Sequence, residues 1–187
     1  KSRVILHFGA VDQTAEVWLN GVRLGAHVGG YAPFSFDITD VLQDKNELRV
    51  RVEDHLSRHV LPYGKQKRER GGMWYTPVSG IWQTVWLESV PETYVRAVRF
   101  ETHGNRVTVR IDGANNGILR VENFAVEVQN GRAEFTVENP RLWSPENPYL
   151  YEVEIETAQE KVQSYFAFRS LEIKTVNGVK RLCLNGK

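Results

Sequence analysis

The chain has 187 residues, of which 41% are hydrophobic and 25% are charged, and its formal net charge is +1. This near-neutral charge gives no general field that would attract nucleic acid. No apolar run approaches the roughly 18 residues that a membrane helix needs. We therefore expect neither nucleic acid nor a membrane as a partner. The length allows one large domain or two small ones.

Alternation of apolar and polar residues dominates the first part of the chain and predicts β-strands. The predicted strands are residues 3–8, 15–19, 47–52 and 83–88. Asn20-Gly21 follows the second of these and predicts a type I′ hairpin, because both central residues of that turn need positive φ. Residues 37–42 are expected to form one short helical turn capped by Asp37 or Thr39.

The rhythm changes slightly after Pro91, where short strands punctuated by Gly and Asn follow one another. Six or seven short strands are predicted in the ranges 94–102, 105–112, 118–128, 132–137, 149–157 and 162–169. Their spacing of roughly ten residues is typical of a small antiparallel sandwich of immunoglobulin type. The sequence thus predicts an all-β protein with a domain boundary near residues 90–92. The strand expected at 180–187 runs into an Asn-Gly turn where the chain stops.

Motifs that carry chemistry are mostly missing. The chain has no Gly-x-Ser-x-Gly elbow, no Gly-x-Gly-x-x-Gly and no P-loop. Cys183 is the only cysteine, which excludes an internal disulfide and a thiolate cluster and leaves the compartment open. His55 and His59 would align as metal ligands on a helix, but the preceding strand and Pro62 argue against one. We predict no catalytic residue, no metal site and no cofactor.

Charged residues give no stronger signal. The basic run at residues 65–70 is expected to be a solvated loop. Glu152, Glu154 and Glu156 alternate along a predicted strand, which fits a wet sheet face. No acidic residue stands in a sequence context that predicts a raised pKa.

Three of the five tryptophans fall within residues 71–90. Trp82 and Trp86 alternate with Gln83, Val85 and Leu87 along a strand, so we expect both tryptophans to lie on one face and brace a sheet. Trp74 precedes the turn, beside Tyr75, and lies off any strand pattern. It is open whether its ring packs against another domain, forms the wall of an active site or belongs to a core.

Four stretches carry a resemblance when they are taken together. They are VILHFGAVDQTAEVWLNGVRLGAHVGGYAPFSFDITDVL, GGMWYTPVSGIWQTVWLE, NPRLWSPENPYLYEVEIE and FAFRSLEIKTVNGVKRLCLNGK. In this order they resemble glycoside hydrolase family 2, the β-galactosidase and β-glucuronidase family. The resemblance implies a sugar-binding jelly roll at residues 1–91 whose first strands would precede Lys1. It further implies an immunoglobulin-like sandwich at 92–169 and the start of a catalytic TIM barrel at 170–187.

The same resemblance implies a function. The acid/base and nucleophile glutamates of the family lie on the barrel, so these residues are expected to be accessory domains that hydrolyse nothing alone. The expected partners are a carbohydrate substrate and the protein's own barrel, and self-association is left open. Some relatives place a substrate-binding aspartate in the stretch matching residues 71–81, where this chain has none. Trp74 and Tyr75 in that loop are the predicted substrate contacts. The alternative is a free-standing carbohydrate-binding module, and the preferred sugar is undecided.

Overall fold

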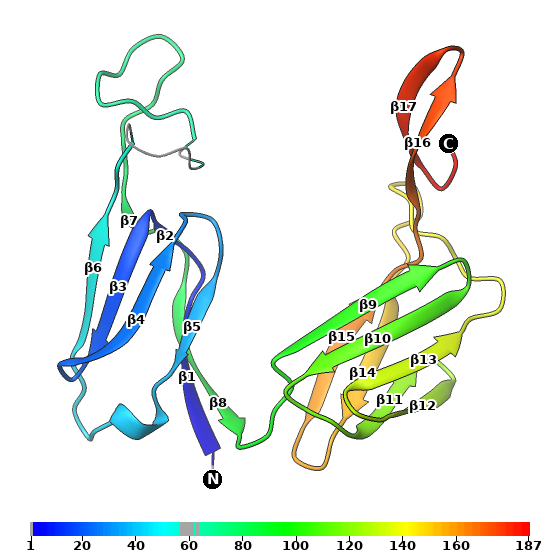
Figure 1. The fold of residues 1–187 in the computed structure, drawn as a ribbon, viewed down its shortest axis with the longest axis horizontal. Coiled ribbons are helices and arrows are strands. Elements are labelled where there is room, and N and C mark those ends of the chain that lie inside the picture. The colour runs from blue at the N-terminus through cyan, green and yellow to red at the C-terminus, as the bar shows by residue number, and fades with distance from the viewer. Residues whose placement is uncertain (1, 57–61, 63) are drawn as a thin grey trace. The chain divides into compact units, whose positions relative to one another are not determined.

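A computed structural model describes residues 2–56, 62 and 64–187 (Figure 1). In these residues the structure contains 17 β-strands and a single 3-10 helix, so the predicted all-β class is confirmed. The chain divides into two compact units, Lys1–Glu92 and Thr93–Lys187.

The first unit is built on two three-stranded antiparallel sheets. One has the order β5-β1-β8 and the other β4-β3-β6, while β2 and β7 form a separate two-residue ladder. The strands are β1 (Ser2–Phe8), β2 (Val11–Asp12), β3 (Thr14–Leu19), β4 (Val22–Val28), β5 (Phe34–Asp37), β6 (Leu48–Glu53), β7 (Gly80–Ile81) and β8 (Val85–Pro91).

The core of this unit lies between the two sheets. Leu6 and Phe8 of β1 pack with Ala15, Val17 and Leu19 of β3 in one buried cluster. Alternate residues of a strand point to opposite faces, so the alternation along β3 puts this apolar row inside and Glu16 outside. Burial of such side chains contributes about 1.5–3 kcal/mol each to folding.

Two local predictions in this unit are confirmed. Asn20 and Gly21 join β3 to β4 with φ angles of 53° and 80°, the backbone that a type I′ turn requires. The Asn20 side chain also accepts a 2.9 Å hydrogen bond from the N–H of Glu47. The helical turn is the 3-10 helix η1 (Thr39–Val41), but its N-cap residue is Ile38, without a side-chain cap hydrogen bond, so the predicted cap was wrong. The Asp37 carboxylate accepts the Thr39 N–H at 3.0 Å just before the helix.

The second unit is a sandwich of a three-stranded and a four-stranded antiparallel sheet, with orders β13-β10-β9 and β12-β11-β14-β15. Figure 1 shows the smaller sheet in front of the larger one. The strands are β9 (Ala97–His103), β10 (Arg106–Asp112), β11 (Gly117–Val121), β12 (Phe124–Val128), β13 (Arg132–Thr136), β14 (Tyr151–Glu156) and β15 (Lys161–Phe166). This order fits an immunoglobulin-like sandwich in which an edge strand, β12, extends the larger sheet.

Tyr151 ties the second sandwich together at the start of β14. Its ring is buried, and its hydroxyl accepts a 2.8 Å hydrogen bond from the N–H of Arg141. This is the geometry of the tyrosine corner of immunoglobulin-like domains. The ring packs against Phe166 and Phe168, with centroids 5.1 and 5.3 Å away. One side chain therefore packs in the core and also hydrogen-bonds the backbone of the preceding loop.

Two strand predictions in the second unit were wrong in detail. Residues 118–128 form the hairpin β11–β12 rather than one strand, with Glu122 at a φ of 46° in the turn. That turn contains no glycine, and a positive φ at a glutamate is uncommon, so a local pattern could not predict it. The strand expected at 180–187 is β17 (Val179–Leu184), and its partner β16 (Leu171–Val176) was missed.

Candidate functional site

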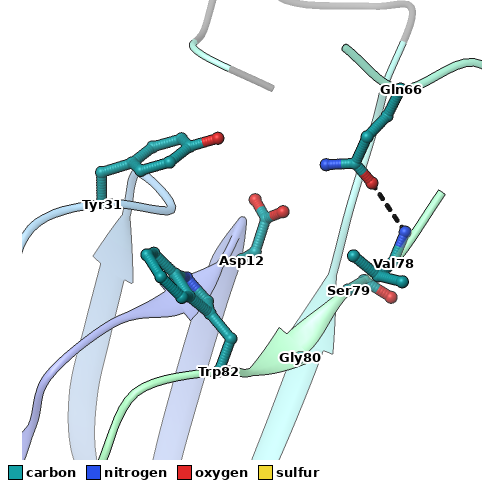
Figure 2. Close-up of a pocket in the computed structure, with 7 residues that line it drawn as sticks. All are labelled: Asp12, Tyr31, Gln66, Val78, Ser79, Gly80 and Trp82. Carbon is teal, nitrogen blue, oxygen red and sulfur yellow. Dashed lines mark hydrogen bonds between the residues drawn. The ribbon is translucent and has the colours of Figure 1, made fainter. Parts of the chain in front are cut away.

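A pocket of about 230 Å³ lies in the first unit, at the β2–β7 ladder. Its lining residues are Asp12, Tyr31, Gln66, Val78, Ser79, Gly80 and Trp82. The register of the ladder places Asp12 opposite Gly80, and the loops after β4 and before β7 supply the walls. Figure 2 shows the Asp12 carboxylate directed into the space between Tyr31 and Gln66.

Asp12 is the chemically unusual residue of this pocket. It is only 8% exposed, and its Oδ1 atom has no hydrogen-bond partner among the described residues. Burial, and to a lesser extent the negative charge of Asp54, raise the pKa of Asp12 above its usual value. The Oδ1 atom of Asp54 is likewise buried without a partner. Burial of a carboxylate oxygen without a donor is costly, which is the physical reason that the pKa of this group is raised.

Gly30 makes room for this carboxylate. A Cβ atom at Gly30 would overlap with Oδ1 of Asp12, so a side chain at position 30 would displace the carboxylate. The carbonyl oxygen of Gly30 accepts a 2.7 Å hydrogen bond from the indole N–H of Trp82. Gly30 thus fixes the position of two pocket residues at once.

Aromatic rings form one wall of the pocket. Tyr31 is 53% exposed and Trp82 is 52% exposed, and their ring centroids lie 5.7 Å apart at an interplanar angle of 70°. Across the pocket the side-chain oxygen of Gln66 accepts the Val78 N–H at 2.7 Å (Figure 2). Aromatic walls with a few placed polar groups are typical of small-molecule sites.

The predicted substrate contacts, Trp74 and Tyr75, lie in the loop between β6 and β7 and do not line this pocket. The Nζ atom of Lys67 lies 4.0 Å from the centroid of the Trp74 ring. Tyr75 is 67% exposed, and its N–H donates to the carbonyl of Lys65 at 2.7 Å. Their role in substrate binding stays a prediction. Lys65, Lys67 and their basic neighbours in the run are exposed, as expected of a solvated loop.

The prediction for Trp82 and Trp86 was wrong. Trp82 precedes β8, since β7 ends at Ile81 and β8 begins at Val85, and it forms the pocket wall. Trp86 lies on β8, 42% exposed, and stacks on His7 with a centroid distance of 4.7 Å. The two tryptophans therefore do not share a strand, because the chain leaves the sheet between them.

No sequence context marked Asp12 as an acid with a raised pKa, yet its pKa is raised in the structure. The pKa of Asp12 rises because tertiary contacts bury it. The structure buries its neighbours Val11 and Gln13 as well. The local amino-acid sequence does not predict whether a single carboxylate is buried. Tyr31 and Gln66 were missed for the same reason.

No group of three or more metal-ligating side chains occurs within residues 2–56, 62 and 64–187. The Nε2 atom of His55 lies 3.6 Å from a carboxylate oxygen of Glu53, and His59 lies outside the described residues. Over the same part of the chain, no helix has the length and apolar character needed to cross a bilayer.

The chain thus forms two successive antiparallel β-sandwiches, the first of which has an aromatic-walled pocket. A family model described as "Glycosyl hydrolase 2 galactose-binding domain-like" matches residues 1–103. A second, "Glycosyl hydrolases family 2", matches residues 92–169. The chain belongs to glycosyl hydrolase family 2, as the sequence motifs indicated.

Named relatives agree with this. A putative β-glucuronidase of Formosa agariphila is 29% identical over 97% of this chain and 25% of its own length. A β-galactosidase of Thermoanaerobacter pseudethanolicus is 27% identical over 93% of this chain and 26% of its own length. The solved β-glucuronidase of an uncultured Clostridium species superposes with a TM-score of 0.75 at 25% identity, over all of this chain and 34% of that one. The chain thus spans between a quarter and about a third of the length of these relatives.

Proposed function

We propose that residues 1–169 are non-catalytic accessory domains of a β-glycosidase of the β-galactosidase or β-glucuronidase type. The whole enzyme hydrolyses terminal β-linked sugars with retention, through two carboxylates carried by a TIM barrel that residues 170–187 begin. The observation that carries this proposal is the family match over both sandwiches, together with relatives named as β-glucuronidases and β-galactosidases.

The pocket supports a binding role rather than catalysis. Retaining glycosidases need two carboxyl groups about 5–5.5 Å apart on either side of the scissile bond. Among the described residues that line this pocket, Asp12 is the single acidic side chain. One carboxylate cannot act as both nucleophile and acid on opposite sides of the same bond.

The β16–β17 hairpin supports the assignment of residues 170–187. Leu171, Ile173 and Leu182 share one face of it and are 59%, 72% and 73% exposed. A large exposed apolar face is typical of a surface that another part of a protein covers. The catalytic barrel is the proposed cover, because the relatives are three to four times as long as the part they share with this chain.

Hydrolysis assays with two lengths of the protein test the proposal. The full-length protein is expected to cleave 4-nitrophenyl β-galactoside or β-glucuronide, and proton NMR should show the β-anomer as the first product. Residues 1–187 alone are expected to give no turnover. Turnover by residues 1–187 would contradict the accessory role, and failure of the full-length protein on every β-glycoside would contradict the glycosidase assignment.

A further inference from the structure

We infer that Asn177 is a site of spontaneous covalent modification, at which asparagine is converted to aspartate and isoaspartate in the folded chain. This inference goes beyond the proposed function and does not depend on it, because it concerns the chemistry of the chain itself. Five asparagines are followed by glycine, and they are Asn20, Asn116, Asn130, Asn177 and Asn185. The structure separates Asn177 from the other four.

The reaction joins the side chain of an asparagine to the backbone of the next residue. The backbone nitrogen of the glycine attacks Cγ of the asparagine, so an N–Cγ bond forms and the Cγ–Nδ2 bond breaks. Ammonia leaves with the proton of the glycine N–H. Water then opens the succinimide ring, and its attack at Cγ gives aspartate, whereas attack at the backbone carbonyl carbon gives isoaspartate. Glycine favours the first step because it has no Cβ atom to obstruct its nitrogen.

Two of the five asparagine side chains are held by hydrogen bonds to the backbone. The Nδ2 atom of Asn20 donates to a carbonyl oxygen at 2.8 Å, and its Oδ1 atom accepts the Glu47 N–H at 2.9 Å. The Nδ2 atom of Asn185 donates to the carbonyl of Trp143 at 2.9 Å, and its Oδ1 atom accepts the Ser170 N–H at 3.0 Å. These hydrogen bonds must break before Cγ can turn toward the next nitrogen.

In two further pairs the glycine is held instead. The N–H of Gly131, which follows Asn130, donates to the carbonyl of Asn115 at 2.7 Å, and Gly131 is buried. Gly117, which follows Asn116, is the first residue of β11 and is paired with β12. The attacking nitrogen of each pair can move only if the packed backbone around it opens.

Neither restraint applies at Asn177. Asn177 and Gly178 form the exposed two-residue turn between β16 and β17, with φ angles of 51° and 76° (Figure 1). Among the described residues, neither the Asn177 amide nor the Gly178 N–H has a hydrogen-bond partner, and the position of a Cβ atom on Gly178 has no atom within 4 Å. The turn can therefore rotate without the loss of a tertiary contact, and such openings need little free energy.

The modification changes the hairpin in two ways. Aspartate adds a negative charge, which cancels the formal net charge of +1. Isoaspartate carries the backbone through the former side chain and adds a methylene group to it, so the turn can no longer adopt the two positive φ angles of type I′. The closing pair of the hairpin, Val176 and Val179, is then expected to lose its register.

The test is a timed incubation of the 187-residue chain at neutral pH, followed by peptide mapping with mass spectrometry. Mapping follows the replacement of NH2 by OH at each of the five asparagines, and an isoaspartate-specific methyltransferase detects isoaspartate. We expect Asn177 to react about tenfold or more faster than each of the others, the scale of the hydrogen bonds that must break elsewhere. In Asn177→Gln the reaction at position 177 should disappear from the map, because the longer side chain closes its ring far more slowly.

Incubation in guanidinium chloride is the matched control. All five pairs have the same Asn-Gly sequence, so the unfolded chain is expected to modify them at similar rates. Two results would overturn the inference. One is a folded chain in which another of the five asparagines reacts as fast as Asn177 or faster. The other is the same ranking with and without denaturant, which would show that neighbouring residues and not the fold set the rates. Neither result bears on hydrolysis by the full-length enzyme, so the proposed function and this inference can fail separately.

Discussion

The indole N–H of Trp82 donates a 2.7 Å hydrogen bond to the carbonyl oxygen of Gly30, which comes 52 residues earlier in the chain. The same glycine leaves no space for a Cβ atom beside the Asp12 carboxylate. One residue without a side chain therefore sets the distance between an aromatic wall and an unpartnered acid. The pocket is a product of the three segments that meet there, and each segment can be tested by itself.

Asp12→Asn is expected to raise the Tm of the first sandwich at pH 7. The pKa of Asp12 is raised in the folded state because the carboxylate is buried. At a pH above that folded pKa the carboxylate is charged, and this charge destabilises the native state relative to the unfolded chain, where it is solvated. The native state binds more protons than the unfolded state between the two pKa values, and stability therefore falls as pH rises through that window.

Thermal unfolding as a function of pH measures this difference. The gain in Tm from Asp12→Asn should shrink as the pH falls toward the unfolded value of about 3.9, because both forms are then neutral in the folded state. A loss of stability at pH 7 would show that Asp12 makes a favourable ionic contact instead. The comparison variant is Asp44→Asn, which replaces an exposed carboxylate.

Asp37→Asn is expected to have the opposite dependence. The pKa of Asp37 is lowered, chiefly by the hydroxyl hydrogen bond from Thr39 and also by Arg3, whose Nη1 atom lies 2.7 Å from the carboxylate. The stability that this carboxylate contributes is present above its unfolded pKa and is lost as pH falls through its folded pKa. The variant should have a lower Tm at pH 7 and match the parent chain in strong acid. A constant difference at every pH would mean that the effect is steric.

Gly30→Ala is expected to destabilise the first sandwich by about 1–3 kcal/mol, the usual cost of overpacking. The new methyl group would overlap with the Asp12 carboxylate. Denaturant titration gives the free energy of unfolding, and a double-mutant cycle with Asp12→Ala tests the cause. The double variant should recover much of the loss, because alanine at position 12 has no carboxylate to displace. Additive losses would place the strain elsewhere.

Tyr151→Phe is expected to destabilise the second sandwich by about 1–3 kcal/mol, since the Arg141 N–H loses its acceptor while the ring stays in place. The hydroxyl accepts that N–H at 2.8 Å. Tyr165→Phe removes a hydroxyl from a ring that is 64% exposed and should change the free energy of unfolding little. Equal effects of the two substitutions would argue against a structural role for the corner.

The sequence by itself determined the fold class and the family. The alternation along β1, β3 and β6 follows from the twofold repeat of a strand. Asn20-Gly21 predicted its turn because Asn and Gly tolerate the positive φ that both central residues of a type I′ turn need. These properties depend on neighbouring residues in the chain, so a short segment of sequence is enough to predict them. The turn at Glu122 was missed because no glycine marks it.

The tertiary structure alone decided the candidate site. Asp12, Tyr31 and Trp82 lie on separate segments, and it is the β2–β7 ladder and the Gly30 contact that bring them together. Whether a carboxylate is buried, and so whether its pKa rises, depends on which distant atoms exclude water from it. Sequence periodicity reports which face of a strand turns inward, but not which side chains meet where a strand ends.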